Sequence, residues 1–147
     1  MKNNFMLEAL RQAKIAFEKD EVPVGAVIVE GEKIIAAAHN QNLSLNDPTA
    51  HAEILTLRQA AQIKNSSRLD GCDLYVTLEP CAMCASAIAL ARIRRVYYAA
   101  SDEKFGAVEN GARIFNSSSC HHHPEIYSGI SEEESRELLQ SFFRSKR

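Results

Sequence analysis

Two short motifs in this sequence carry side chains that can bind a metal ion. The first is the segment 51–53, His-Ala-Glu, and the second is the segment 80–84, Pro-Cys-Ala-Met-Cys. Cysteines three residues apart on a helix share a face, so Cys81 and Cys84 can bind one ion. A helix N-terminus also lowers the pKa of a thiol and favours the thiolate that a metal requires.

With His51 these cysteines make three ligands, which is the number found in catalytic zinc sites. A structural zinc site is normally closed by four protein ligands, whereas a catalytic site leaves one position for water. Zinc lowers the pKa of that water and makes it a nucleophile. Glu53, two residues after His51, is then a candidate general base and acid beside the metal.

Less specific interpretations of the same residues remain open. A Cys-x-x-Cys pair alone also fits a redox pair, a structural half-site or two buried thiols. Cys120, which precedes three consecutive histidines, could close a structural site as fourth ligand. Thiolate ligands do not by themselves distinguish zinc from other metals that bind sulfur. Cys72 is predicted to be a small, partly buried residue without a role.

Length and composition predict one globular domain over residues 1–147. Of the residues, 46% are hydrophobic and 24% are charged, and the net charge is −2, so strong non-specific binding of nucleic acid is not expected. No segment approaches the about 20 apolar residues that cross a bilayer, and the N-terminus lacks the pattern of a signal peptide. We therefore expect a cytoplasmic protein without membrane contact, whose cysteines stay reduced.

Apolar periodicity places the two motifs at the starts of helices between strands. Thr49 is the predicted N-cap of one helix, and Pro80 the predicted first residue of another. Ser131 and Glu134 resemble a capping box, and 101–130 is predicted to be irregular. Strands are expected at 22–29, 33–38, 74–78 and 96–100, and helices at 3–19, 49–64, 80–91 and after 131. This order predicts a three-layer α/β domain with helices on both faces of the sheet.

Together the motifs match the zinc-dependent nucleobase deaminases, in which H-x-E is followed by P-C-x-x-C. The wider sequence resembles the bacterial tRNA-specific adenosine deaminases of the cytidine deaminase superfamily. The similar segments extend along nearly the whole chain and are 22–27, 47–54, 74–85, 92–97, 101–107, 127–130 and 142–144. The resemblance implies a cytidine-deaminase-like fold with a mixed five-stranded sheet, one zinc ion per subunit and a homodimer. It also implies conversion of adenosine to inosine at the wobble position of a tRNA anticodon, typically in an arginine tRNA.

The resemblance further implies substrate contacts for individual residues. Asn40 matches a residue that hydrogen-bonds the purine, and Asp102 and Lys104 match a loop that contacts the nucleotide. Positions near the flipped-out base, or supplying backbone beside it, are Val22, Val24, Leu78, Phe143, Glu79 and Pro80. His122 is a further candidate for a substrate contact, in a segment, 108–125, that departs from the family pattern. Without the family resemblance, Asn40 is equally well explained as a turn residue. Val22, Val24 and Leu78 would then be assigned to the hydrophobic core.

A tRNA substrate suits the modest net charge of this chain. A base in an anticodon loop is already single-stranded, so flipping it out costs little. Recognition then depends on loop shape and a few phosphate contacts. The basic residues at the end of the chain, Arg144, Lys146 and Arg147, are expected to lie near the RNA.

Two other functions compete with this hypothesis. A deaminase of free guanine or cytosine would use the same metal chemistry, although it would not need the aromatic and basic C-terminal helix. A non-catalytic zinc-binding domain that holds RNA or a protein partner would not depend on Glu53.

Overall fold

The structure is a computed structural model that describes the backbone of residues 2–146 and the side chains of residues 4–146, so Arg147 lies outside the described residues. Its elements follow the chain in the order α1 (Lys2–Glu18), β1 (Gly25–Glu30), β2 (Lys33–His39), α2 (Ala52–Lys64), β3 (Cys72–Leu78), α3 (Ala82–Leu90), β4 (Arg95–Ala100), η1 (Ile114–Asn116), β5 (Glu125–Ser128) and α4 (Glu132–Ser145). None of the helices in this part of the chain is long and apolar enough to cross a membrane.

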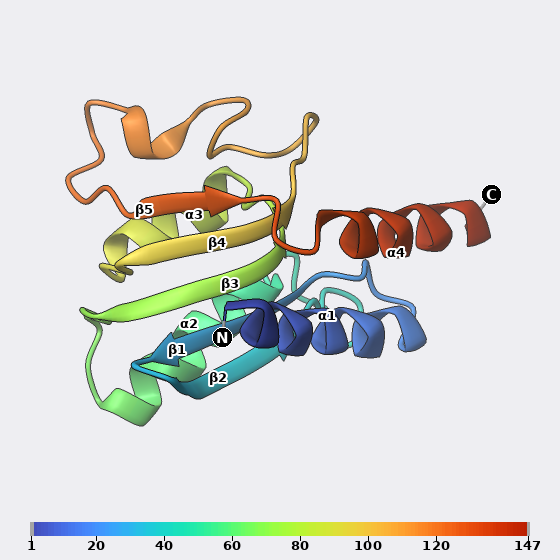
Figure 1. Ribbon diagram of the computed structural model, residues 1–147, viewed down its shortest axis with the longest axis horizontal. Coiled ribbons are helices and arrows are strands. Elements are labelled where there is room, and N and C mark those ends of the chain that lie inside the picture. Colours follow the sequence, from blue (N-terminus) through green and yellow to red (C-terminus); the bar gives the residue numbers. More distant parts are fainter. Residues whose placement is uncertain (1, 147) are drawn as a thin grey trace.

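The strands form one mixed sheet with the order β2-β1-β3-β4-β5. The strand β1 is antiparallel to both of its neighbours, whereas β3, β4 and β5 are mutually parallel. In Figure 1, α1 and α4 lie on one side of the sheet and α2 and α3 on the other. The predicted three-layer arrangement and the five-stranded sheet implied by the resemblance are both confirmed.

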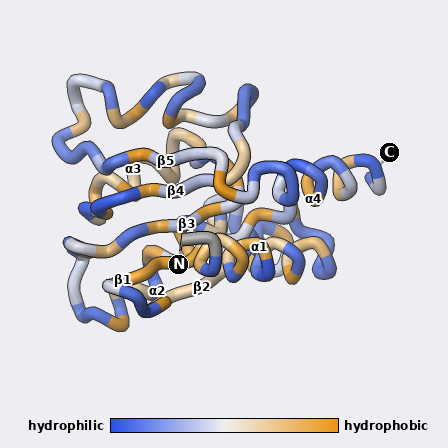
Figure 2. The backbone as a smooth tube through the Cα atoms, viewed as in Figure 1, coloured by the Kyte–Doolittle hydropathy of each residue, from blue (hydrophilic) through white to orange (hydrophobic). Residues whose placement is uncertain are grey.

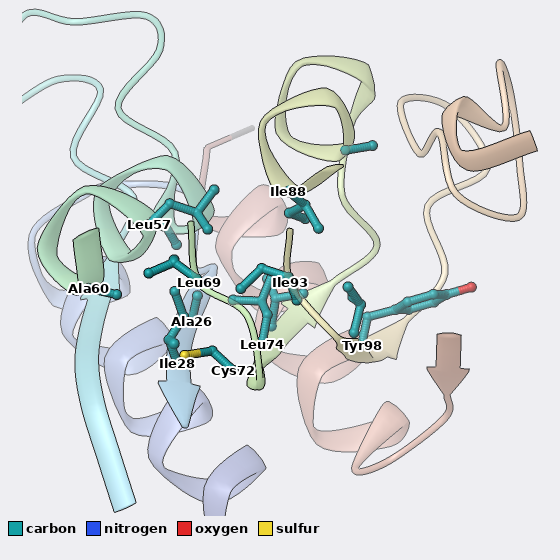
Figure 3. Close-up of a cluster of buried hydrophobic side chains, with 14 of the residues drawn as sticks. Ala26, Ile28, Leu57, Ala60, Leu69, Cys72, Leu74, Ile88, Ile93 and Tyr98 are labelled. Atoms are coloured by element: carbon teal, nitrogen blue, oxygen red, sulfur yellow. The ribbon is translucent and has the colours of Figure 1, made fainter. Parts of the chain in front are cut away.

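Alternation along the strands divides the core between the two faces of the sheet. On the face of α2 and α3, buried side chains such as Leu74, Ile88 and Ile93 pack together (Figure 3). On the face of α1, Met6 and Val27 belong to a second cluster. Along the backbone in Figure 2, β1 is largely hydrophobic and α4 is mostly hydrophilic. This is the pattern expected of a central strand and of a helix with one side in water.

Three tyrosines lie in register across the parallel half of the sheet. Tyr75 on β3 pairs with Tyr97 on β4, which pairs with Tyr127 on β5. Their ring centroids are 4.3 and 5.0 Å apart, and the rings are stacked. Such aromatic pairs contribute about 0.5–1.5 kcal/mol each beyond the area that they bury. The ladder therefore helps to hold the short edge strand β5 on the sheet.

The prediction of Thr49 as N-cap of α2 is wrong. The helix begins at Ala52 and His51 is its N-cap residue. The Thr49 side chain does not cap the helix, because its hydroxyl donates to Oδ1 of Asp47 at 2.7 Å. The backbone N–H of Thr49 donates to the same oxygen at 2.8 Å. The N–H of Ala52 donates instead to Oδ1 of Asn40, at 2.8 Å. A side chain twelve residues earlier thus caps α2, and local sequence patterns do not reveal such a partner.

The predicted start of α3 and the predicted capping box of α4 are also wrong. Pro80 lies outside α3, whose N-cap is the extended residue Cys81, and the Pro80 carbonyl accepts the N–H of Ala107 at 2.9 Å. Ser131 is the N-cap of α4 but has a φ of 59°, in the left-handed region, and its side chain makes no capping hydrogen bond. A capping box requires an extended N-cap backbone, so it cannot form here.

The segment 101–130 and the start of the first strand also differ from the sequence prediction. The segment 101–130, expected to be irregular, contains η1 and the short strand β5. At the other end of the sheet, β1 begins at Gly25 rather than at Val22. The N–H of Val24 donates to the carbonyl of Val22 at 2.8 Å, which closes a tight turn around Pro23. This turn takes Val22 and Val24 out of the strand, and both line the cavity described below.

Candidate active site

The residues of the two motifs meet where α2 and α3 begin. His51 is the N-cap of α2, Cys81 is the N-cap of α3, and Cys84 lies in the first turn of α3. Nδ1 of His51 is 3.7 Å from Sγ of Cys81 and 3.5 Å from Sγ of Cys84. The two helices contact each other on the same face of the sheet, where α2 packs on β1 and β2. Residues 30 positions apart in the sequence are brought together in this way.

These separations fit the geometry of a tetrahedral zinc ion. Bonds of about 2.3 Å to sulfur and about 2.0 Å to nitrogen place each sulfur about 3.5 Å from the nitrogen. Potential ligand atoms of His51, Cys81 and Cys84 all lie within 4.8 Å of one another, and no fourth histidine, cysteine or carboxylate of the described side chains joins them. The cluster is therefore compatible with zinc and with a coordination position left for a small molecule.

The first of the two cysteines favours its thiolate form. A hydrogen bond from the Cys84 thiol lowers the pKa of Cys81 to about 4, assisted by His51 and the backbone N–H of Cys84 and opposed by burial. The same hydrogen bond, together with burial, raises the pKa of Cys84. The pair therefore holds one proton between two sulfurs. A metal ion replaces that proton when both cysteines become ligands.

Glu53 lies beside this cluster and is almost completely buried. Its exposed fraction is 4%, and it lines the same cavity as His51 and Cys81. Burial raises the pKa of Glu53 to about 7, against the opposing effects of its backbone and of His51. A carboxyl group that is easily protonated near neutral pH can both accept and donate a proton.

A cavity of about 590 Å³ opens onto the cluster and Glu53. Its volume lies within the range of about 300–1,000 Å³ that is typical of small-molecule sites. The walls combine apolar side chains with a few polar groups. They are formed by Asp20, Glu21, Val22, Val24, Asn40, Asn42, Leu43, His51, Glu53, Leu78, Glu79, Cys81, Asp102, Phe105, Phe142 and Lys146.

Asn40 and Asp102 line this cavity, and both also hold backbone in place. Asn40 uses its Oδ1 to cap α2 through Ala52, which leaves its Nδ2 hydrogens to donate to a bound molecule. Asp102 accepts the N–H groups of Lys104 and Phe105 with one carboxylate oxygen, at 3.1 Å each. Lys104 itself is exposed and is not part of the cavity wall.

Glu79 has a structural role that its motif did not reveal. Only 2% of its surface is exposed, and its carboxylate accepts the N–H groups of Asp102, Val108, Glu109 and Asn110 at 2.9–3.1 Å. The side-chain amide of Asn110 donates to it as well, at 2.7 Å. Burial alone would raise the pKa of Glu79, but these hydrogen bonds outweigh it and lower the pKa.

The loop fits closely around this carboxylate. A Cβ atom on Gly106 would lie 2.6 Å from Cδ of Glu79 and 2.4 Å from the Asp102 carbonyl oxygen, so only glycine fits at this position. The one sequence signal for this arrangement is Glu79 itself, a charged residue directly after the apolar strand at 74–78. Its partners lie 23 to 31 residues further on, so spacing does not identify them.

Replacing Glu79 with glutamine is expected to destabilise the fold by about 2–4 kcal/mol. The amide group cannot accept all five hydrogen bonds, and its own N–H₂ would face buried N–H donors. The measurement is urea unfolding, with amide hydrogen exchange of Val108, Glu109 and Asn110, which should become faster. Glu103→Gln removes the same charge from an exposed position of the same loop and serves as control. Equal unfolding free energies for the two variants would contradict this role.

On α4 it is Phe142, not Phe143, that reaches the cavity. Phe142 is buried against Phe17 and lines the wall, whereas Phe143 lies with Arg144 in a separate surface groove. Adjacent helix residues point about 100° apart, so only one of the two aromatic rings can face inward. Lys146 also lines the cavity, and its ammonium group lies 5.3 Å from the centroid of the Phe142 ring.

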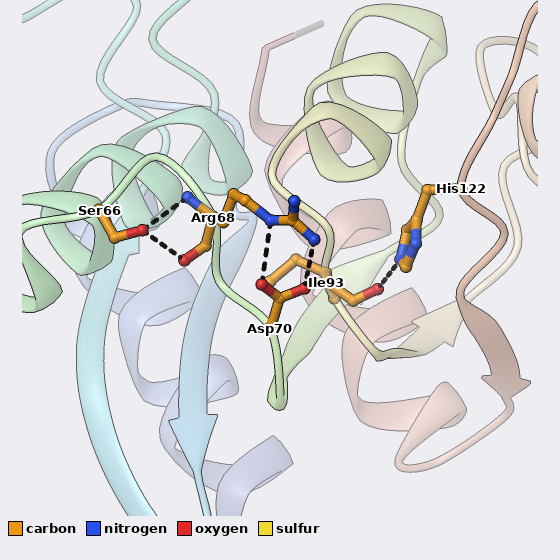
Figure 4. A network of polar contacts seen from close by, with 5 residues as sticks. All are labelled: Ser66, Arg68, Asp70, Ile93 and His122. Carbon is orange, nitrogen blue, oxygen red and sulfur yellow. Dashed lines mark hydrogen bonds and ion pairs between the residues drawn. The ribbon is translucent and has the colours of Figure 1, made fainter.

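His122 and Cys120 lie in a different part of the molecule. Nε2 of His122 is 2.6 Å from the carbonyl oxygen of Ile93, and Figure 4 shows the ring turned toward that group. Sγ of Cys120 donates to the carbonyl of His122 at 3.1 Å. Both residues line a smaller depression beside α3. Cys120 therefore does not complete the cluster of His51, Cys81 and Cys84, as the structural-zinc alternative requires.

Known proteins that are similar to this chain are deaminases. The family of MafB19-like deaminases matches residues 1–147. A tRNA-specific adenosine deaminase from Agrobacterium fabrum is 55% identical over 99% of this chain and 96% of its own length. A solved structure from a study of A-to-I editing by tRNA:A34 deaminases at the wobble position of transfer RNA is also 55% identical, with a TM-score of 0.91 over 92% of this chain and 99% of that one.

A guanine deaminase structure from Bacillus subtilis is more distant, with 41% identity and a TM-score of 0.64 over 67% of this chain and 63% of that one. Near-complete coverage at 55% identity separates the first two proteins from it. The chain therefore belongs to the MafB19-like deaminases and to the family of tRNA-specific adenosine deaminases.

Proposed function

We propose that this protein deaminates adenosine to inosine at the wobble position of a tRNA anticodon, with an arginine tRNA as substrate, in the cytoplasm. The observation that carries the proposal is the three-donor cluster with buried Glu53 beside it, at the wall of a cavity large enough for a purine. The similarity of the whole chain to tRNA-specific adenosine deaminases supports the choice of substrate.

His51, Cys81 and Cys84 would hold one zinc ion per subunit. Their separations match tetrahedral coordination, and three protein ligands are typical of catalytic zinc. When bound, zinc supplies Lewis-acid chemistry that makes water nucleophilic near neutral pH. The imidazole and the two sulfurs fix the position of that chemistry at the N-termini of two helices.

Glu53 moves the protons of the reaction. A water molecule adds to C6 of adenine and loses a proton to the Glu53 carboxylate. The protonated carboxyl then donates this proton to the ring nitrogen N1. Glu53 next takes the proton of the new C6 hydroxyl and passes it to the amino group, so that the C6–N bond breaks, ammonia leaves and the C6 carbonyl forms. The net reaction consumes one water and gives inosine. Burial of Glu53 keeps bulk water from competing for these protons.

The rest of the cavity would position the base. Val22, Val24, Leu78 and Phe142 provide apolar walls for the purine ring. The Nδ2 hydrogens of Asn40 donate to a purine acceptor, because Oδ1 of this residue is already used by α2. The backbone at Glu79 and Pro80 borders the position of the attacking water.

Incubation of the purified protein with total tRNA, followed by sequencing for inosine, tests the substrate. Inosine confined to the wobble position of an arginine tRNA is the expected result. Ammonia release from free adenosine, guanine and cytosine is measured in parallel, because one similar protein is a guanine deaminase. Turnover of a free base without any inosine in tRNA would replace the proposal with the free-base alternative.

The basic end of α4 is proposed to contact phosphates of the RNA. Arg144 and Lys146 are exposed, and Lys146 borders the cavity. Each phosphate contact contributes about 0.7 to the slope of log affinity against log salt for a single strand. Arg144→Ala with Lys146→Ala should therefore lower that slope by about 1.4. A filter-binding titration of an anticodon stem-loop measures it, and an unchanged slope would remove α4 from the interface.

A homodimer is proposed as the active assembly. The helix α3 is mostly apolar, and Ala82 and Leu90 are exposed on it beside the polar Ser86. Large exposed apolar surfaces often mark an interface between subunits. Sedimentation equilibrium should give twice the chain mass of 16.3 kDa, and Leu90→Glu should shift the equilibrium toward the monomer. A wild-type mass of one chain at micromolar concentration would exclude the dimer.

A further inference from the structure

Two large apolar side chains are exposed at the wall of the cavity. Phe105 is 73% exposed and Leu43 is 65% exposed. Other large apolar residues of the described chain are also exposed, but among these only Phe105 and Leu43 line the cavity that contains Glu53. They come from different loops, one after β4 and the other after β2. A molecule whose reactive part enters the cavity therefore meets these two side chains on its way in.

The loop that carries Phe105 is held in place by its backbone. The N–H of Phe105 donates to Oδ1 of Asp102 at 3.1 Å, and the N–H of Asp102 donates to Oε1 of buried Glu79 at 3.0 Å. The N–H of Gly106 donates to the Asp102 carbonyl at 2.9 Å. Phe105 is thus fixed on both sides, and its ring is exposed because of the loop's conformation.

Leu43 is held in a similar way by a second buried carboxylate. Glu21, of which only 2% is exposed, accepts the N–H of Leu43 at 3.0 Å and the N–H of Ser44 at 2.8 Å. Each of the two loops is therefore attached to an internal glutamate. Rigid support of exposed apolar side chains beside a cavity is the arrangement expected of a binding site that is formed before its ligand arrives.

The chemistry of the ligand follows from the side chain. An exposed aromatic ring stacks on an unpaired nucleobase, and this is the commonest way in which proteins hold single-stranded RNA. A free base or nucleoside that fills the cavity has no second base to place on Phe105. The exposed ammonium group of the neighbouring Lys104 suits the phosphate between two nucleotides.

We infer that Phe105 stacks on the base next to the one that enters the cavity, and that Leu43 packs against the same unstacked strand. The two side chains thereby select a single-stranded RNA over a free nucleoside. This inference rests on the proposed function, because it assigns the part of the RNA that lies outside the cavity. Phe105 would bind substrate and would not take part in the proton transfers.

The test measures deamination of an anticodon stem-loop by wild type, Phe105→Ala and Phe105→Tyr. Loss of stacking is expected to raise KM by at least about fivefold, with kcat changed by less than about twofold. The tyrosine ring retains a stacking surface, so Phe105→Tyr should restore the wild-type KM. Ile63→Ala removes an apolar side chain of similar exposure, 64%, from the far end of α2 and should leave KM unchanged.

Two further stem-loops identify the stacked base. Each carries an abasic nucleotide on one side of the reactive adenosine. One of them should raise the KM of wild type but not that of Phe105→Ala, because the stacking partner is already lost in the variant. Equal effects of both abasic sites on the two proteins, or a wild-type KM for Phe105→Ala, would overturn the inference alone. Wild-type protein that does not deaminate the intact stem-loop would instead overturn the proposed function.

Discussion

Glu53→Gln should lose deaminase activity by about 10²- to 10⁴-fold while the protein keeps its fold and its metal. Glutamine has nearly the same size as glutamate and fits the buried position, but it cannot accept and return a proton. The loss should appear in kcat with little change in KM, because a proton transfer acts in the transition state. Single-turnover deamination of a stem-loop, with metal content by elemental analysis, measures both properties.

The control for this variant is Glu32→Gln, which removes the same charge from an exposed turn between β1 and β2. Its activity should equal that of wild type. Glu53→Gln with more than a tenth of the wild-type activity would exclude Glu53 as the proton-transferring group. Wild-type protein without any activity on RNA, but with bound zinc, would favour the alternative of a non-catalytic binding domain.

Cys84→Ala should lower the metal content from about one ion per chain to nearly none, and activity by more than about 100-fold. Removal of groups that only support metal ligands typically costs 10- to 100-fold, so removal of a ligand should cost at least as much. The free energy of unfolding should fall as well. A metal ion that binds only the folded state stabilises that state by its binding free energy, and the variant loses this contribution. Thermal unfolding with and without added zinc measures this contribution.

Cys72→Ala is the matched control for the ligand variant. Both cysteines are fully buried, but Cys72 begins β3 in the main core and is not part of the metal cluster. Cys72→Ala should lose some stability through the cavity that it leaves and should keep its metal and its activity. Equal metal loss in the two variants would mean that general unfolding, rather than ligand removal, explains the result for Cys84.

The parts of the fold that could be predicted from the sequence are those with a clear apolar periodicity. Alternation and helical spacing identified four strands and four helices, because each of these buries one face over several residues. The strand β5 was missed from the residues alone, since it has only four residues and pairs with a strand about 30 positions earlier. Helix starts were misplaced where the cap comes from a distant residue, as Asn40 does for α2.

The centre of the site was predictable because its chemistry requires particular residue types at fixed spacing. The structure brings His51, Cys81 and Cys84 together, with Glu53 beside them. The outer parts were less predictable. That Phe142 rather than Phe143 lines the cavity could have been predicted from the sequence. Ser135, Leu139 and Phe142 follow the helical spacing of one inward-facing side of α4. The role of the buried Glu79 carboxylate in holding the following loop could not be predicted, because only the fold brings its hydrogen-bond donors to it.

The tyrosine ladder gives this protein a built-in optical probe of one half of its sheet. The chain contains no tryptophan and four tyrosines, and all four lie on β3, β4 or β5. Tyrosine fluorescence and the tyrosine signal in near-ultraviolet circular dichroism should therefore report on the structure of the parallel strands, with little signal from β1, β2 or the helices. If the edge strand detaches before the remainder unfolds, the optical transition will precede the loss of helical signal during denaturation.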